Sequence, residues 1–409
     1  MPRRDRALRR RVAALAILAA LVVVAALIGW FLTQPQKHAA FALNESSFYE
    51  LDGWSSADAR PALDAFRRSC ASMLALPSNH PMSGEGYGGA SGDWAVVCRA
   101  VPAHFDTAGA RRWFEANFVP FAVTQGTSDM GIFTGYYEPE LRGSRKLHGA
   151  FRWPVYGVPP DLIEVDLGIF RVSLRGETIV GRILRHTLVP YPTRAEIDHD
   201  GLPGTLVLFY TDDPAELFFL QIQGSGRVRF DNGMIERVAY AAQNGWPYTP
   251  IGRVLVDEGK IPRQRLSMQR IRAWMDAHPG DARALMEKDE SYVFFKELPL
   301  GDPSLGSPGA EGVPLTPGAS LAVDSRVHPL GAPIYVVAQQ PDESGGEQVL
   351  QQLFVAQDIG GAIRGAVRGD VFFGYGARAE NRAGVMKSNG RMFVLLPKGL
   401  AARVAGARS

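Results

Sequence analysis

The chain has 409 residues, a formal net charge of +2, 44 glycines and 28 prolines. This length exceeds one typical hydrophobic core, so two domains are expected, and the turn-rich composition favours β architecture over a helical bundle. The first eleven residues carry six arginines and one aspartate, which leaves 2 − 5 = −3 for the remainder. A body of nearly balanced charge argues against a polyanion-binding protein, so we expect no nucleic-acid partner.

Val12 to Leu32 is an apolar stretch of 21 residues behind three arginines. At about 1.5 Å per residue it spans the hydrocarbon core of a bilayer. The sequence therefore predicts a basic cytoplasmic segment (1–11), a transmembrane anchor (12–33) and a linker (34–55). The alternative is a cleaved signal peptide, with small residues for cleavage at Ala39-Ala40 or Ala42.

Cys70 and Cys98 are the only cysteines. An even number in an exported chain favours one disulfide, worth about 3 kcal/mol by loop entropy, and the alternative is two buried free thiols. The eight histidines show no metal-ligand spacing. We therefore expect no metal and no cofactor.

Helical periodicity occupies 57–74 and 108–118, and the pattern then changes to short β-rich runs. Helical patterns return at 234–240, 250–258 and 266–278, where Pro279-Gly280 is expected to end the last helix. A proline- and glycine-rich loop (299–317) precedes the final strands. The β-rich runs are 132–133, 170–172, 178–179, 205–209, 218–223 and 226–230.

Three aspartates near the end of the chain, Asp324, Asp358 and Asp370, each follow or enter an apolar run of strand type. A single aspartate in such a position is as often a turn cap as a functional group. Three of them, with aromatic residues at Phe372, Phe373 and Tyr375, favour a site. Carboxylates flanked by aromatic faces are the usual means of cutting glycosidic bonds.

The three aspartates lie in the frames AVDSR (322–326), AQDIGGAI (356–363) and RGDVFFG (368–374). Other blocks along the chain are FTGYYEP (133–139), FLQIQGSG (219–226), YAAQNG (240–245), SYVFF (291–295) and NRAG (381–384). With these frames and blocks the sequence resembles the membrane-bound lytic murein transglycosylase A family over roughly residues 60–400. The best-known members carry a lipidated cysteine near the amino terminus, which this sequence lacks.

The resemblance implies a mainly β protein with flanking helices (α+β). A double-psi β-barrel domain (56–135 and 237–400) would contain the three-aspartate module (316–398). A smaller, barrel-like β domain (136–236) would interrupt it. We expect the protein at the periplasmic face of the bacterial inner membrane, or in the periplasm if the signal is cleaved. Its partners would be peptidoglycan glycan strands, the membrane through the N-terminal helix, and cell-wall synthesis or division proteins.

The implied activity is cleavage of the MurNAc–GlcNAc β-1,4 bond with formation of a 1,6-anhydro ring. Asp370 carries the family's general acid/base role, and Asp358 either raises its pKa or supports the backbone. Two alternatives remain: a hydrolase that uses both aspartates, and a non-catalytic glycan-binding protein. The expected substrate-binding residues are Tyr136, Tyr137, Glu138, Gln221, Gln223, Gly224, Ser225, Gln243, Asn244 and Asp324, although one of the two tyrosines is expected in the core and Asp324 to have a mainly structural role.

Overall fold

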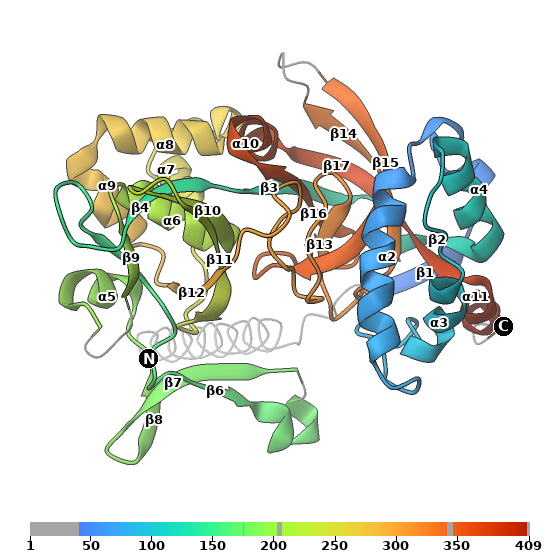
Figure 1. The fold of residues 1–409 in the computed structure, drawn as a ribbon, viewed down its shortest axis with the longest axis horizontal. Coiled ribbons are helices and arrows are strands. Elements are labelled where there is room, and N and C mark those ends of the chain that lie inside the picture. The colour runs from blue at the N-terminus through green and yellow to red at the C-terminus, as the bar shows by residue number, and fades with distance from the viewer. Residues whose placement is uncertain (1–40, 175, 203–206, 342–346, 407–409) are drawn as a thin grey trace, which may run out of the picture. The chain divides into compact units, whose positions relative to one another are not determined.

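The computed structural model describes residues 41–174, 176–202, 207–341 and 347–406 (Figure 1). The predicted segments 1–11 and 12–33 lie outside these residues, as does the first part of the predicted linker 34–55. Within the described ranges, no helix is both long enough and apolar enough to cross a bilayer.

The larger sheet closes into a six-stranded barrel. Its strands follow the order β17, β14, β15, β13, β16 and β3, and β3 pairs with β17 to complete the ring, while β2 and β1 extend outwards from β17. The pairs β13–β15 and β16–β3 are parallel, and the other pairs around the ring are antiparallel. The strands are β1 (Phe41–Glu45), β2 (Phe118–Gln125), β3 (Gly131–Glu138), β13 (Ser320–Val323), β14 (Pro333–Pro341), β15 (Glu347–Ile359), β16 (Arg368–Tyr375) and β17 (Lys387–Pro397).

Helices share the core of this barrel. In α2 (Arg60–Ala75), Leu63, Phe66, Cys70 and Met73 recur at three- and four-residue steps, and all four are buried in one core with residues of the barrel strands. Cys70 forms a disulfide with Cys98, and the two Cα atoms are 5.1 Å apart. The other helices of this part are α3 (Ser91–Arg99), α4 (Thr107–Asn117), α10 (Gly376–Val385) and α11 (Lys398–Gly406).

A second sheet has six strands in the order β12-β11-β10-β4-β9-β5, with its own core that includes Leu141, Val155 and Phe209. β12 lies beyond residue 236 and pairs with β11. The domain boundaries given by the sequence stay a prediction. The strands are β4 (Glu140–Ser144), β5 (Trp153–Tyr156), β9 (Val207–Thr211), β10 (Ser225–Phe230), β11 (Ile235–Gln243) and β12 (Val293–Leu298).

A third sheet has three strands in the order β6-β7-β8, and five helices accompany the second and third sheets in the sequence. Its strands are β6 (Ile163–Asp166), β7 (Thr178–Leu184) and β8 (Thr187–Pro190). The helices are α5 (Arg194–Asp200), α6 (Pro214–Gln223), α7 (Ile251–Asp257), α8 (Met268–Ala277) and α9 (Pro279–Met286).

The fold class predicted from the sequence is wrong. We expected a mainly β protein with a double-psi β-barrel, a barrel-like insert and an N-terminal transmembrane anchor. The structure is a mixed α/β fold with a closed six-stranded barrel, and the predicted anchor lies outside the described residues. The physical reason is that helices fill much of the core: α2, α3 and α4 contribute aromatic and aliphatic side chains to it. The helical patterns at 57–74 and 108–118 correspond to α2 and α4, but the glycine- and proline-rich composition led us to give them too little weight in the fold class.

Several individual elements also differ from expectation. Residues 218–223, expected as a strand, belong to α6, because a short apolar run does not distinguish a buried helix from a strand. Residues 234–240, expected as a helix, lie largely in β11. Residues 170–172 do not form a strand. The helix expected over 266–278 does end before Pro279-Gly280, as α8 at Ala277, but Pro279 also begins a further helix, α9. Proline at the first helical position is favourable because that residue has no intrahelical N–H bond to lose.

Candidate active site

Two of the three aspartates lie in one row across the barrel sheet. Ala322 on β13 pairs with Asp358 on β15 and with Asp370 on β16, and Asp370 also pairs with Thr134 on β3. Strands are about 4.8 Å apart, so the Cα atoms of Asp358 and Asp370 are separated by about 10 Å. The small methyl group of Ala322 lies between the two carboxylates.

This row lies on the sheet face opposite to side chains of the main core. Neighbours in sequence point to opposite faces of a strand, and Leu321, Val323 and Val371 lie in the main core. Ala322 instead packs in a separate apolar cluster with Phe372 and Tyr136. The cluster also includes Leu315 and Ile363. The aspartates therefore lie beside an apolar cluster that is separate from the main core.

Asp370 is half-buried and has one oxygen bound within the protein. The Thr134 hydroxyl donates to Oδ1 at 2.6 Å, and Nη2 of Arg368 donates to that hydroxyl oxygen at 2.9 Å. Among the described residues, no hydrogen bond reaches Oδ2. Burial raises the pKa of Asp370, the Thr134 hydrogen bond and the Arg368 charge lower it, and the charge of Asp358 raises it.

Asp358 has both oxygens bound. The Tyr136 hydroxyl donates to Oδ2 at 2.7 Å, and the backbone N–H of Ala310 donates to Oδ1 at 3.0 Å. Burial raises the pKa of Asp358, although these two hydrogen bonds oppose the rise. Burial and the neighbouring Asp358 also raise the pKa of the Tyr136 hydroxyl, which keeps it a donor. Asp358 is thus fixed in position by β3 and by the loop before β13.

Asp324 lies in a different environment. It is 1 % exposed, and its carboxylate receives both Nε and Nη2 of Arg326, at 2.9 and 2.7 Å, and the N–H of Gly365 at 2.9 Å. Burial alone would raise the pKa of Asp324, but these hydrogen bonds lower it to about 2. Asp324 is an ionised group that ties the end of β13 to the segment before β16.

Neither Tyr137 nor Glu138 contributes its side chain to the aspartate row: Tyr137 packs in the main core, and Glu138 forms a buried ion pair. Tyr137 lies in the main core, as alternation with Tyr136 requires. Glu138 is fully buried and pairs with Nε of Arg227 at 3.1 Å, and Oε1 accepts the N–H of Ser307 at 2.5 Å. Arg227 also donates to the carbonyl oxygen of Pro303. This group holds the loop between β12 and β13 against the second sheet.

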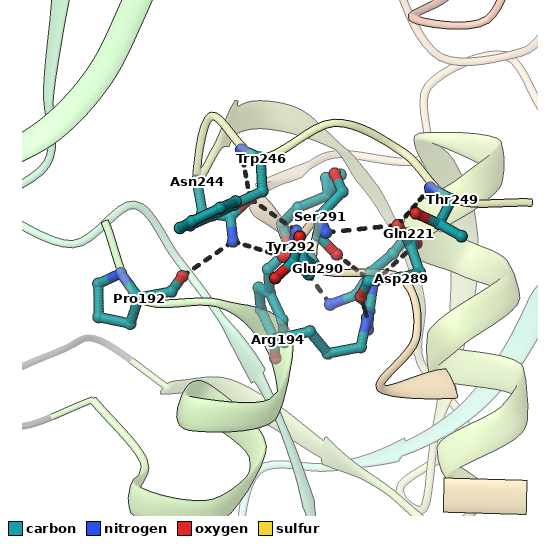
Figure 2. Close-up of polar contacts among 11 residues, drawn as sticks. Pro192, Arg194, Gln221, Asn244, Trp246, Thr249, Asp289, Glu290, Ser291 and Tyr292 are labelled. Carbon is teal, nitrogen blue, oxygen red and sulfur yellow. Dashed lines mark hydrogen bonds and ion pairs between the residues drawn. The ribbon is translucent and has the colours of Figure 1, made fainter. Parts of the chain in front are cut away.

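Gln221 and Asn244 belong to a buried polar network (Figure 2). Asn244 donates to the carbonyls of Pro192 and Glu290, both at 2.9 Å, and accepts the N–H of Tyr292 at 2.8 Å. Gln221 accepts from Nη1 of Arg194. The Arg194 side chain is 4 % exposed and lies 3.6 Å from Oδ2 of Asp289. These residues join four chain segments, and within the described ranges none of their hydrogen bonds reaches Asp324, Asp358 or Asp370.

The other predicted substrate-binding residues lie where α6 meets β10 and at the end of β11. Gly224 ends α6 with φ at +79°, a left-handed conformation that favours glycine. Gln223 accepts the N–H of Tyr137 through Oε1 at 3.1 Å, which links this turn to β3. Ser225 begins β10, and Gln243, at the end of β11, is exposed.

Two family models match the chain: the MltA specific insert domain over residues 132–296 and the 3D domain over residues 319–396. The crystal structure of membrane-bound lytic murein transglycosylase from Agrobacterium tumefaciens is 31 % identical, with a TM-score of 0.78, and the match covers 88 % of this chain and 99 % of that one. The chain belongs to the membrane-bound lytic murein transglycosylase A family. The resemblance identified in the sequence is thereby confirmed.

Relatives of this family extend the comparison. Membrane-bound lytic murein transglycosylase A of Escherichia coli K12 is 34 % identical over 267 residues, and the match spans 64 % of this chain and 65 % of the relative's length. The structure of E. coli MltA with bound chitohexaose is 26 % identical, with a TM-score of 0.63, and is covered over 97 % of its chain and 89 % of this one.

Within the family fold, sequence reasoning missed Thr134, Arg368 and Ala310 as partners of the aspartates. A signal for the first two was present. Thr134 and Tyr136 alternate on β3, and Arg368 and Asp370 alternate on β16, so each pair shares a strand face. Ala310 could not be found this way, because its contact is a backbone N–H in a loop without periodicity.

Proposed function

We propose that this protein is a periplasmic lytic transglycosylase that cleaves the β-1,4 bond between MurNAc and GlcNAc in peptidoglycan. Asp370 would be its single general acid/base. The observation that carries the proposal is a half-buried carboxyl with a raised pKa and one oxygen, Oδ2, not bound by any described residue. The names of the relatives and the chitohexaose bound to E. coli MltA support a β-1,4-linked glycan as the substrate.

The first step is proton transfer from Asp370 to the glycosidic oxygen. The bond between this oxygen and C1 of MurNAc breaks, GlcNAc leaves as an alcohol, and C1 becomes cationic. The raised pKa of Asp370 serves this step, because a general acid must hold its proton near neutral pH.

In the second step the C6 hydroxyl of the same MurNAc attacks C1 and gives its proton to Asp370. A 1,6-anhydro ring closes, no water is consumed, and Asp370 returns to its starting state. Intramolecular capture is efficient because a well-oriented neighbouring group has an effective molarity of about 10⁵ M or more.

Asp358 fits a supporting role better than that of a hydrolytic base. Both of its oxygens accept hydrogen bonds from Tyr136 and Ala310, so neither is free to activate water without losing a partner. Its charge instead raises the pKa of Asp370 and favours the protonated acid.

The glycan would be held by polar groups that the protein leaves accessible. Gln243 is exposed, and Gln223 uses only its Oε1 in the contact with Tyr137, so its amide N–H groups can meet hydroxyl or acetamido oxygens. Gly224 and Ser225 lie beside it. Tyr136, Tyr137, Glu138, Gln221, Asn244 and Asp324 would act indirectly, by holding these elements in place.

Digestion of purified sacculi in ¹⁸O-labelled water tests the chemistry. We expect anhydro-muropeptides without label, each lighter by one water than a reducing product, in the mass spectrum. Label at C1 of MurNAc would instead establish a hydrolase, and glycan binding without any released muropeptide would establish a non-catalytic wall-binding protein.

A further inference from the structure

The carboxyl group of Asp370 sits at the end of a directional hydrogen-bond chain. Arg368 donates from Nη2 to Thr134 Oγ1, and the Thr134 hydroxyl donates to Asp370 Oδ1. A guanidinium has donors and no acceptor, so the Thr134 hydrogen cannot point back at Arg368. It must point at Asp370. The 2.6 Å separation between the two oxygens lies in the range of a charge-assisted bond.

The start of this chain is anchored to backbone. Nη1 of Arg368 donates to the carbonyl of Gly369 at 2.5 Å and to that of Ile132 at 3.2 Å, on the two strands that carry Asp370 and Thr134. The guanidinium is therefore fixed relative to both strands, and it cannot turn away to release the threonine hydroxyl without breaking these contacts.

We propose that Arg368 and Thr134 are positioning residues that confine the catalytic proton of Asp370 to Oδ2. This inference rests on the proposed function. A proton on Oδ1 would displace the hydrogen bond from Thr134, whereas Oδ2 has no donor among the described residues. The same oxygen would then deliver the proton to the glycosidic oxygen and recover it from the C6 hydroxyl, so the carboxyl need not rotate between the two steps.

Other charged groups near Asp370 set the background for a pH measurement. Asp358 on β15 raises the pKa of Asp370, and Arg368 on its own strand lowers it. Tyr136 on β3 is bound to Asp358, and Lys387 on β17 is the exposed register partner of Thr134. Arg382 of α10 lies over Phe373, whose ring belongs to the opposite face. Removing the Thr134 hydroxyl changes none of these charges.

The test compares Thr134→Val with Thr134→Ser on soluble uncrosslinked glycan strands. Valine keeps the β-branched shape and removes the hydroxyl. We expect kcat to fall about tenfold with KM unchanged, because the general acid loses its orientation and not its substrate. The alkaline limb of the pH profile moves to higher pH, because a hydrogen bond that lowers the pKa of Asp370 is lost. Thr134→Ser, which keeps the hydroxyl, should have the kcat and the alkaline pH limb of wild type.

Thr124→Val, on β2 of the same sheet, is the matched control and should behave as wild type. Arg368→Gln removes the cation and should also move the alkaline limb to higher pH, which provides a second route if Thr134→Val folds poorly. The proposed role of Thr134 and Arg368 would be overturned if Thr134→Val had the kcat and the alkaline pH limb of wild type. It would also be overturned if Thr134→Ser lost as much activity as Thr134→Val. Activity in Asp370→Asn would instead overturn the proposed function itself, and with it the positioning role of Arg368 and Thr134.

Discussion

The aspartate row on the barrel and the Asn244 network differ in how completely their polar groups are paired. Asn244 is 1 % exposed, and its side-chain donors and acceptor all meet backbone partners (Figure 2). Asp370 is half-buried, and one of its oxygens has no partner among the described residues. Satisfied buried groups fix a structure, whereas a carboxyl with a raised pKa and an unbound oxygen is a candidate for a functional site.

Asp324 shows that the contrast is not simply between residue types. It shares the strand-end context of the other two aspartates, but Arg326 and Gly365 saturate it and lower its pKa to about 2, whereas the pKa values of Asp358 and Asp370 are raised. The environment around each carboxyl assigns its role. Experiments that remove one group from each class can break or sharpen this division.

The largest effect is expected for Asp370→Asn. The amide cannot transfer a proton, so release of muropeptides should fall by about three orders of magnitude or more. The folded state should be as stable as wild type at pH 7, or more so, because a carboxyl whose folded pKa is raised loses its stabilising contribution as pH rises. Muropeptide release and urea unfolding measure the two quantities, and a folded, active variant would remove Asp370 from the mechanism.

The sequence indicated the strands that carry the aspartates through short apolar runs close to each aspartate: 320–323, 353–356 and 371–373 all lie in barrel strands. It did not indicate the state of 218–223, where the apolar run becomes helical after the Asp213 cap and Pro214. These local patterns alone could not indicate the closure of the barrel, because the pairing of β3 with β17 joins residues more than 250 positions apart in the chain.

The candidate site divides in the same way. Alternation alone separates Tyr136 from Tyr137, whereas the position of Thr134 beside Asp370 also depends on the pairing of β3 with β16. No local pattern reveals that Asn244 is buried while its neighbour Gln243 is exposed, since both are amides at the end of one strand. That difference depends on Pro192, Glu290 and Tyr292, which reach Asn244 from two other segments. The roles of the predicted site residues in glycan binding and catalysis remain predictions.

The next largest effect tests that pair of amides. Asn244→Ala leaves several buried backbone groups without a partner and should lower the free energy of unfolding by about 3 kcal/mol. Gln243→Ala should change stability by less than about 0.5 kcal/mol, because the side chain is exposed, and should weaken glycan binding instead. Urea unfolding and glycan-binding titrations distinguish the two. Equal losses of stability in both variants would contradict the assignment of Asn244 to structure and Gln243 to substrate.

The smallest effect concerns Asp324 and has a definite sign with pH. Its folded pKa of about 2 lies below the ordinary value of 3.8, so its contribution to stability is present above about pH 4 and is lost as pH falls towards 2. The difference corresponds to about 2 kcal/mol. Asp324→Asn should therefore be less stable than wild type by about this amount at pH 7, and the difference in stability should narrow as the pH falls from 4 to 3.

The exposed Asp64, paired with Arg67 at the surface, gives the control: Asp64→Asn should cost less than about 0.5 kcal/mol at each pH. Urea unfolding at pH 7, 4 and 3 makes the comparison. A gap between wild type and Asp324→Asn that stays constant over this range would mean that shape, and not the ionised carboxylate bound by Arg326 and Gly365, accounts for the role of this aspartate.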